Sequence, residues 1–117
     1  LFMADEPVIA QIESYCAAQH DPRVTSNRSW ATYFELLPTG GTKGDALREL
    51  SRITGVPLAR CIAIGDYDND AEMLRTAGIS AAPANASPMA QAAAQLHVCS
   101  CEQGAVADLL ARLQTMP

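Results

Sequence analysis

The sequence has few basic residues: Lys and Arg number 8 against 13 Asp and Glu, and the net charge is −5. A protein that grips nucleic acid by its phosphates needs the opposite balance, so we expect no nucleic-acid partner. The sequence also lacks an apolar run long enough to span a membrane. Its N-terminus has no basic region followed by an apolar one, so no secretory signal is recognisable. The chain begins with Leu1 rather than Met, which suggests a piece of a longer protein.

The four cysteines form no Cys-x-x-Cys pair, and their spacing is not that of a disulfide framework; they are Cys16, Cys61, Cys99 and Cys101. His97, Cys99 and Cys101 alternate, so on a strand they would share one face and could bind a soft metal. No fourth ligand is apparent and Cys101 is expected past the strand, so small buried thiols are the better interpretation. Free thiols indicate a reducing compartment, and we expect the cytoplasm.

The strongest break in the chain is Pro38-Thr39-Gly40-Gly41. Before it, Leu1–Ala4 predicts the tail of a strand. Ser29–Leu37 predicts a strand as well, because aromatic and β-branched residues are dense there. Between these segments Pro7 opens a helix at a tolerated first position. The apolar stripe of that helix is expected to consist of Val8, Ile12, Tyr15 and Cys16.

After the break, strands and helices alternate. We expect strands at Cys61–Ile64, Ile79–Ala82 and Leu96–Cys99. Helices are expected at Lys43–Thr54, at Asn69–Ala77, after Ser87-Pro88, and in a last segment with Val106, Leu109, Leu110 and Leu113 at helical spacing. The first of these helices should turn inward the residues Ala46, Leu47, Leu50 and Ile53. This alternation predicts βαβ units, hence an α/β fold with a parallel sheet. With 49% hydrophobic residues, 117 residues suffice for one small domain with a core.

Three aspartates and one asparagine crowd the segment Gly65–Asp70, directly after the apolar run Cys61–Ile64. Such a run ended by Gly predicts a buried strand, and α/β sheets bind ligands at the carboxyl ends of their strands. Oxygen-only ligands suit a hard cation, above all Mg²⁺. Taken singly, each residue also fits an ordinary turn or helix start. Taken together, they favour a metal site made from Asp66, Asp68, Asn69 and Asp70.

A second chemical feature is the helix start at Lys43. Thr42 and Asp45 have the spacing of a capping box, which predicts that the helix begins here. Lys43 is then a cation at the positive end of a helix, where the macrodipole disfavours it. A residue that breaks a local rule is a functional candidate, and Lys43 could hold a phosphate at this anion-binding end. The alternative is a solvated surface lysine.

Five short motifs follow one another in a fixed order: Lys43-Gly44, Gly65-Asp66-x-x-Asn69-Asp70-x-x-Met73-Leu74, Ala77-Gly78, Asn85-Ala86 and Gly104-Ala105-Val106. In order and spacing they resemble the haloacid dehalogenase superfamily, most closely its Cof-type phosphatases. The resemblance implies a Rossmann-like parallel-sheet core, whose C-terminal part would be residues 38–117. Residues 1–37 would be the C-terminal remnant of an α/β cap domain.

The resemblance also assigns roles to single residues. It implies that Lys43 steadies the nucleophile and the phosphoryl group, and that Asp70 helps to position Lys43 or the metal site. Asp66 is implied to bind Mg²⁺. Asn69 is implied to contribute to the metal or phosphate environment, and Asn85 to line the site. Lys43 and Asp70 are thus the catalytic candidates, Lys43, Asn69 and Asn85 the phosphate-binding candidates, and Asp66, Asn69 and Asp70 the metal candidates.

One departure from the superfamily pattern is decisive for this chain. The nucleophile of the superfamily lies in an Asp-x-Asp-Gly-Thr segment, which this sequence lacks. An aspartyl-phosphate cannot form without its Asp. We therefore expect the C-terminal part of a Mg²⁺-dependent phosphatase for a small phosphorylated metabolite, inactive by itself. Its expected partners are the missing N-terminal half or a second copy of the chain.

Two other classes remain open at this point. The chain could be a non-catalytic module that binds Mg²⁺ or a partner protein. A receiver domain also has acidic strand ends and a lysine, but here Lys43 precedes the acidic segment, which argues against that class.

Overall fold

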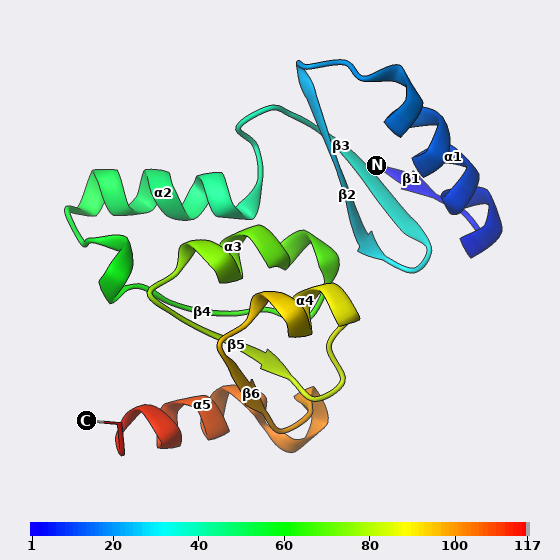
Figure 1. The fold of residues 1–117 in the computed structure, drawn as a ribbon. Helices are drawn as coiled ribbons and strands as arrows, with labels where there is room; N and C mark the ends of the chain where they lie inside the picture. Colours follow the sequence, from blue (N-terminus) through cyan, green and yellow to red (C-terminus); the bar gives the residue numbers. More distant parts are fainter. Residues whose placement is uncertain (117) are drawn as a thin grey trace.

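The computed structural model describes residues 1–116, which form two separate three-stranded sheets (Figure 1). The first sheet is antiparallel, in the order β1-β3-β2: β1 (Phe2–Met3), β2 (Val24–Trp30) and β3 (Tyr33–Pro38). Helix α1 (Glu6–Gln19) packs against β3. We call this part, β1–β3 with α1, the antiparallel unit.

The antiparallel unit corrects one sequence prediction. The segment Ser29–Leu37, expected to be a single strand, contains the turn of a hairpin, in which Trp30 pairs with Tyr33. The turn residues Ala31-Thr32 include no Gly, Pro, Asn or Asp, so the usual chemical signal of a turn is missing. The Arg28 side chain supplies a bond instead: its Nη2 donates to the carbonyl oxygen of Ala31 at 2.9 Å.

The predicted apolar stripe of α1 is right only in part, because Ile12 and Cys16 are half-buried. The buried residue of this helix is Ile9, whereas Val8 and Tyr15 are exposed. The sheet covers just a small part of the helix, because it has only three strands and one of them, β1, has only two residues. Phe34 on β3, 1% exposed, is the other fully buried large side chain of this unit.

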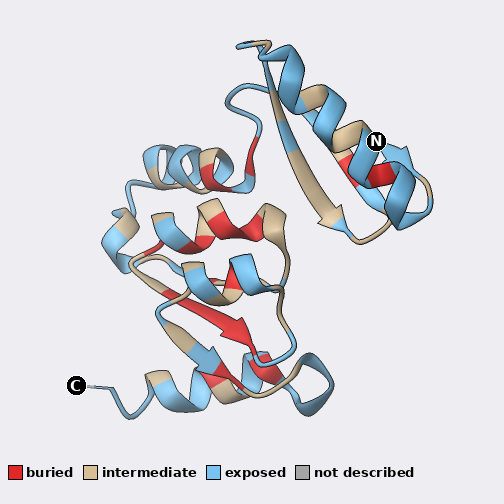
Figure 2. Cartoon of the chain, turned by 45° about the vertical axis from the view of Figure 1, so that its right-hand side comes forward, coloured by how far each residue is buried: buried red, intermediate tan, exposed pale blue. Residues whose placement is uncertain are grey.

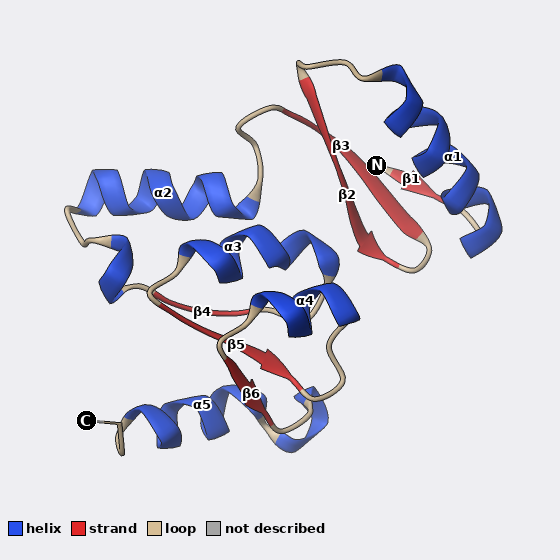
Figure 3. Ribbon diagram, viewed as in Figure 1, coloured by secondary structure: helices blue, strands red, loops and turns tan. Residues whose placement is uncertain are grey.

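The second sheet is parallel, in the order β4-β5-β6, as the alternating pattern predicted (Figure 3). Its strands are β4 (Ile62–Ile64), β5 (Ile79–Pro83) and β6 (Leu96–Val98). The helices of this part are α2 (Lys43–Thr54), α3 (Ala71–Thr76), α4 (Pro88–Ala93) and α5 (Ala105–Leu113). Short 3-10 turns occupy Leu58–Arg60, Asp68–Asp70 and Cys101–Gln103.

Helices cover both faces of the parallel sheet, and its central strand β5 is buried along most of its length (Figure 2). On the face of α3 and α4 the core consists of Ala63, Leu74, Ala77 and Ala90. On the face of α5 it consists of Ala81, Val98, Ala105 and Leu109. The many alanines let helix and sheet backbones approach closely. Among residues 1–116, no helix combines the length and apolarity needed to cross a membrane.

Part of the apolar surface predicted to face inward is uncovered. In α2, Leu47 packs on the core, but Leu50 and Ile53 are 55% and 68% exposed. The reason is that α2 packs on α3 rather than on the sheet (Figure 1). The face of α2 that carries Leu50 and Ile53 is therefore left uncovered. Strand β4 lies at the edge of the sheet within the described residues, and its Ile62 is half-exposed.

Candidate active site

Helix α2 begins with the predicted capping box. The Thr42 hydroxyl accepts a hydrogen bond from the Asp45 backbone N–H at 3.1 Å, and the Asp45 carboxylate accepts one from the Thr42 N–H, also at 3.1 Å. The Thr42 hydroxyl also donates to that carboxylate at 2.7 Å. These bonds hold the pKa of Asp45 below its usual value, with the Thr42 hydroxyl as the largest cause. Lys43 is therefore fixed as the first residue of a well-defined helix.

The start of α2 is pressed against α3. A Cβ at Gly44 would lie 2.6 Å from the Glu72 side chain, so a larger residue here would force Glu72 to move. Arg48 then joins the two helices, with Nη1 2.7 Å from a Glu72 oxygen and 3.0 Å from an Asp45 oxygen. Hydrogen bonds from Thr42 and Arg48 lower the pKa of Glu72. The position of Lys43 relative to the acidic segment is thus set by packing, not by the helix alone.

Asp70 is the buried centre of the site, with only 4% of its surface exposed. Its Oδ1 forms an ion pair with Lys43 Nζ. Its Oδ2 accepts hydrogen bonds from the backbone N–H groups of Asp66 at 3.0 Å and Tyr67 at 3.2 Å. A Cβ at Gly65 would lie 2.4 Å from the Asp70 Cβ, so Gly is required where the chain passes this side chain. One carboxylate therefore closes the segment Gly65–Asp70, which we call the acidic loop, and balances the positive charge of Lys43 at the start of α2.

The other two aspartates have different surroundings. The Asp68 carboxylate accepts a bond from the Ser87 hydroxyl at 2.6 Å, at the start of α4. The Asp66 carboxylate is exposed, and its contact in the described residues is the Cys101 thiol, 3.9 Å away. Its main chain is held, because the Asp66 carbonyl oxygen accepts from the Ser87 N–H at 2.9 Å. Asp66 thus presents a free carboxylate on a fixed backbone.

The two predicted asparagines lie differently. Asn69 is half-buried inside the 3-10 turn Asp68–Asp70. Asn85 is exposed after β5, and its Oδ1 accepts from the Cys101 backbone N–H at 3.0 Å. Asn85 therefore joins the loop after β5 to the loop after β6, at the same edge of the sheet as the acidic loop. The structure brings Lys43, Asp66 and Asp70 into one connected group, with Asn85 linked to Asp66 through Cys101.

Cys101 is a site neighbour that the sequence interpretation missed. It lies past β6, as expected, but it is exposed rather than a buried structural thiol. Desolvation and the negative charge of Asp66 raise the pKa of the Cys101 thiol. No local signal marks this contact, because Asp66 and Cys101 are 35 positions apart and meet only through the sheet.

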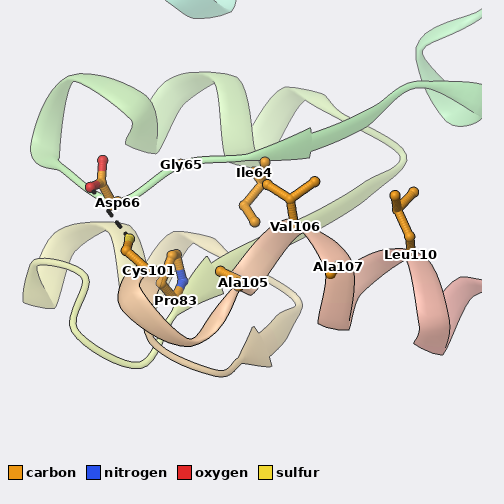
Figure 4. A pocket seen from close by; sticks show the side chains of 10 residues that line it. Ile64, Gly65, Asp66, Pro83, Cys101, Ala105, Val106, Ala107 and Leu110 are labelled. Carbon is orange, nitrogen blue, oxygen red and sulfur yellow. Dashed lines mark hydrogen bonds between the residues drawn. The ribbon is translucent and has the colours of Figure 1, made fainter.

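A cavity of about 600 Å³ adjoins Asp66 and Cys101, between the exposed edge of β4 and helix α5 (Figure 4). Asp66 and Cys101 lie at one end of it. The walls are otherwise mainly apolar and include Ile64, Pro83, Ala105, Val106 and Leu110. The carboxylate candidate for a metal therefore borders an apolar groove.

The donors fit a magnesium ion in kind. Among residues 1–116, no three His, Cys, Asp or Glu side chains converge on a common metal position. Mg²⁺ does not need such a cage, since it commonly uses one or two carboxylates and completes its shell with water and phosphate oxygens. The free carboxylate of Asp66 meets that requirement.

Comparison with known proteins decides the family. The profile of the haloacid dehalogenase-like hydrolases matches residues 1–110. This chain belongs to that family. The fold agrees: SMU.1108c from Streptococcus mutans UA159 has a TM-score of 0.86 and 30% identity, over 97% of this chain and 43% of that one. The resemblance to Cof-type phosphatases, drawn from the motifs, is confirmed.

Two curated relatives carry phosphatase names. The HMP-PP phosphatase of Serratia proteamaculans is 47% identical over 78 residues, which are 65% of this chain and 28% of that protein. The 5-amino-6-(5-phospho-D-ribitylamino)uracil phosphatase YitU of Bacillus subtilis is 34% identical over 113 residues, 94% of this chain and 42% of that protein. The chain thus spans less than half the length of either relative.

Proposed function

We propose that this chain supplies the lysine and metal-binding side of a Mg²⁺-dependent phosphatase that hydrolyses a small phosphorylated metabolite. The observation that carries the proposal is the arrangement around buried Asp70. This carboxylate is held by Lys43 and two backbone N–H groups, while the exposed Asp66 carboxylate beside it contacts the weak thiol donor of Cys101. Family membership and the phosphatase names of both curated relatives support it.

Each residue then has a distinct task. Asp66 holds Mg²⁺, which supplies positive charge to the phosphoryl oxygens. The Lys43 ammonium faces the same phosphoryl group, and Asp70 orients it. Asn69 and Asn85 contribute polar groups to the metal and phosphate environment. The substrate is a phosphorylated small molecule, like the phospho-ribitylamino-uracil in the name of the Bacillus relative.

The attacking group comes from outside these 117 residues, because the sequence lacks the Asp-x-Asp-Gly-Thr segment. In the proposed reaction an aspartate carboxylate attacks phosphorus, the P–O bond to the metabolite breaks, and the leaving oxygen takes a proton from water and departs as the alcohol. Water then cleaves the aspartyl-phosphate and releases inorganic phosphate. The chain by itself is accordingly inactive.

The edge of β4 and the adjoining cavity support a place for the complementary segment. Ile64 on β4 and exposed Val106 and Leu110 on α5 line the apolar cavity beside Asp66, and Ile62 on the same edge strand is half-exposed. A strand added to this edge would satisfy unpaired backbone groups and bring its carboxyl end near Asp66. We propose the N-terminal half of the protein as the occupant, and a second copy of the chain as the alternative.

Activity of a longer protein that includes the Asp-x-Asp-Gly-Thr segment tests the assignment. Asp66→Asn and Lys43→Ala should each lower kcat/KM by about 10²-fold or more, because each removes one preorganised electrostatic partner. Cys99→Ser is the matched control and should keep the wild-type rate. Wild-type rates for both site variants would refute the roles. Turnover of a generic phosphate ester by the 117-residue chain, with contaminants excluded, would refute its inactivity.

The non-catalytic module remains the second candidate, favoured by the exposed apolar groove between β4 and α5. The module and the phosphatase differ in one measurable property, the turnover of phosphate esters. If the chain is a module, the longer protein hydrolyses no phosphate ester, whereas the chain still binds the N-terminal half or a second copy.

A further inference from the structure

The antiparallel unit meets the acidic loop through one pair of aromatic rings. Trp30, at the end of β2, stacks on Tyr67, with ring centroids 5.2 Å apart and planes at 30°. This distance and tilt lie in the range of favourable aromatic pairs. Figure 1 shows the end of β2 next to the start of α3, where the acidic loop enters the helix, and β2 contacts the turn Asp68–Asp70.

The pairing of β2 with β3 is irregular just before Trp30. The register of the hairpin shifts between Arg28 and Trp30, and an irregularity of this kind re-aims the side chain that follows it. Trp30 is 53% exposed, so burial in its own unit does not explain its position. The covalent connection between the sheets passes through Thr39–Gly41, where Gly40 has a φ of 87°. The ring pair is therefore a second tie between two parts joined by a loop.

Both ends of the stack are anchored. On the side of Trp30, the mostly buried Arg28 side chain donates to the carbonyl oxygen of Ala31, the next residue, and lies 3.6 Å from a Glu13 oxygen on α1. On the other side, the Tyr67 N–H donates to the Asp70 carboxylate at 3.2 Å. Burial is the main cause that raises the pKa of Tyr67, and the Arg28 charge opposes it. The charge of Arg28 in the antiparallel unit thus acts on the Tyr67 phenol.

We propose that the Trp30–Tyr67 stack is a latch that holds the antiparallel unit on the acidic loop and responds to ligands bound there. Tyr67 is the neighbour of Asp66 and shares its hydrogen-bond acceptor, Asp70 Oδ2. A cation or phosphate held by the Asp66 side chain adds one more tie to this segment and therefore restrains Tyr67 further, and with it the ring on which Trp30 rests. Trp30 and Tyr67 are positioning residues, and the ligand response rests on the proposed function.

The fluorescence of the chain tests the latch directly, because Trp30 is the only tryptophan among the 117 residues. Tyr67→Ala should shift Trp30 emission to longer wavelength and raise its quenching by acrylamide. Tyr67→Phe keeps the ring and should restore the wild-type spectrum. Tyr15→Ala, at a 68% exposed position on α1, is the matched control and should change neither signal. Identical emission and quenching for wild type, Tyr67→Ala and Tyr67→Phe would overturn the latch.

Titration with Mg²⁺ and with inorganic phosphate tests the response, with calorimetry as the independent measure of binding. Binding should lower the acrylamide quenching of Trp30 in the wild type and leave it unchanged in Tyr67→Ala. Mg²⁺ binding without a Trp30 response overturns the coupling and leaves the proposed function standing. Absence of any Mg²⁺ or phosphate binding overturns the ligand response together with the metal part of the proposed function, while the quenching of Tyr67→Ala still decides the latch.

Discussion

Replacing Asp70 by Asn should destabilise the folded chain, because Asp70 is a buried charged group whose partners all interact with its negative charge. The substitution keeps the shape of the side chain and removes its charge. In the wild type Oδ2 accepts two backbone hydrogen bonds, from Asp66 and Tyr67, and Oδ1 pairs with Lys43. In the variant, an amide NH₂ group would face the Lys43 ammonium if the oxygen kept both backbone bonds.

The size of the effect follows from these contacts. A hydrogen bond to a charged group contributes about 1.5–3 kcal/mol and a neutral one about 0.5–1.5, so each backbone bond should lose about 1 kcal/mol. Lys43 is half-exposed, which limits the loss of its ion pair to about 1 kcal/mol or less. The total is about 2–3 kcal/mol, which for a chain of this size lowers Tm by roughly 10 °C.

Urea and thermal unfolding followed by circular dichroism measure this change. Asp66→Asn is the matched control: it removes the same charge from an exposed carboxylate that accepts no backbone hydrogen bond, so its free energy of unfolding should change by less than about 0.5 kcal/mol. If Asp70→Asn and Asp66→Asn had equal stabilities, Asp70 would not be the structural centre of the loop.

Three further predictions concern stability. Gly65→Ala should cost about 1–3 kcal/mol in urea unfolding, because the new Cβ would meet Asp70, and an unchanged midpoint would contradict that approach. The folded-state pKa of Asp45 is lowered, so the stability it contributes is present above its unfolded value of 3.8 and is lost as pH falls through the lower folded pKa. Asp45→Asn should therefore flatten the acid limb of a Tm–pH curve, and a parallel curve would argue against the capping box. Leu74→Ala should cost about 2–5 kcal/mol, whereas Ile53→Ala should be nearly neutral in the isolated chain; equal losses would mean that α2 buries the face expected from its sequence.

Local chemistry was sufficient for several elements. Helix α2 begins at Lys43 and ends at Thr54 as predicted, because the capping box at its start and Gly55 at its end, with a φ of 72°, are signals carried by neighbouring residues. The parallel sheet follows from alternation of short apolar runs with helices. The hairpin at Ala31-Thr32 escaped prediction because its turn is stabilised by Arg28 rather than by a turn-forming residue.

By itself, the sequence determined which groups gather at the carboxyl edge of the sheet: a lysine at a helix start, an acidic loop after a buried strand, and an asparagine after the next strand. The resemblance to the superfamily already implied different roles for Asp66 and Asp70, but local chemistry does not separate the two side chains. The tertiary structure supplies the physical reason: burial beside the start of α2 pairs Asp70 with Lys43 and the backbone, whereas the Asp66 carboxylate stays exposed. Only the tertiary structure places Cys101 beside Asp66 and Trp30 on Tyr67. These contacts join segments far apart in the chain, and their geometry depends on how sheets and helices pack, which no local pattern encodes.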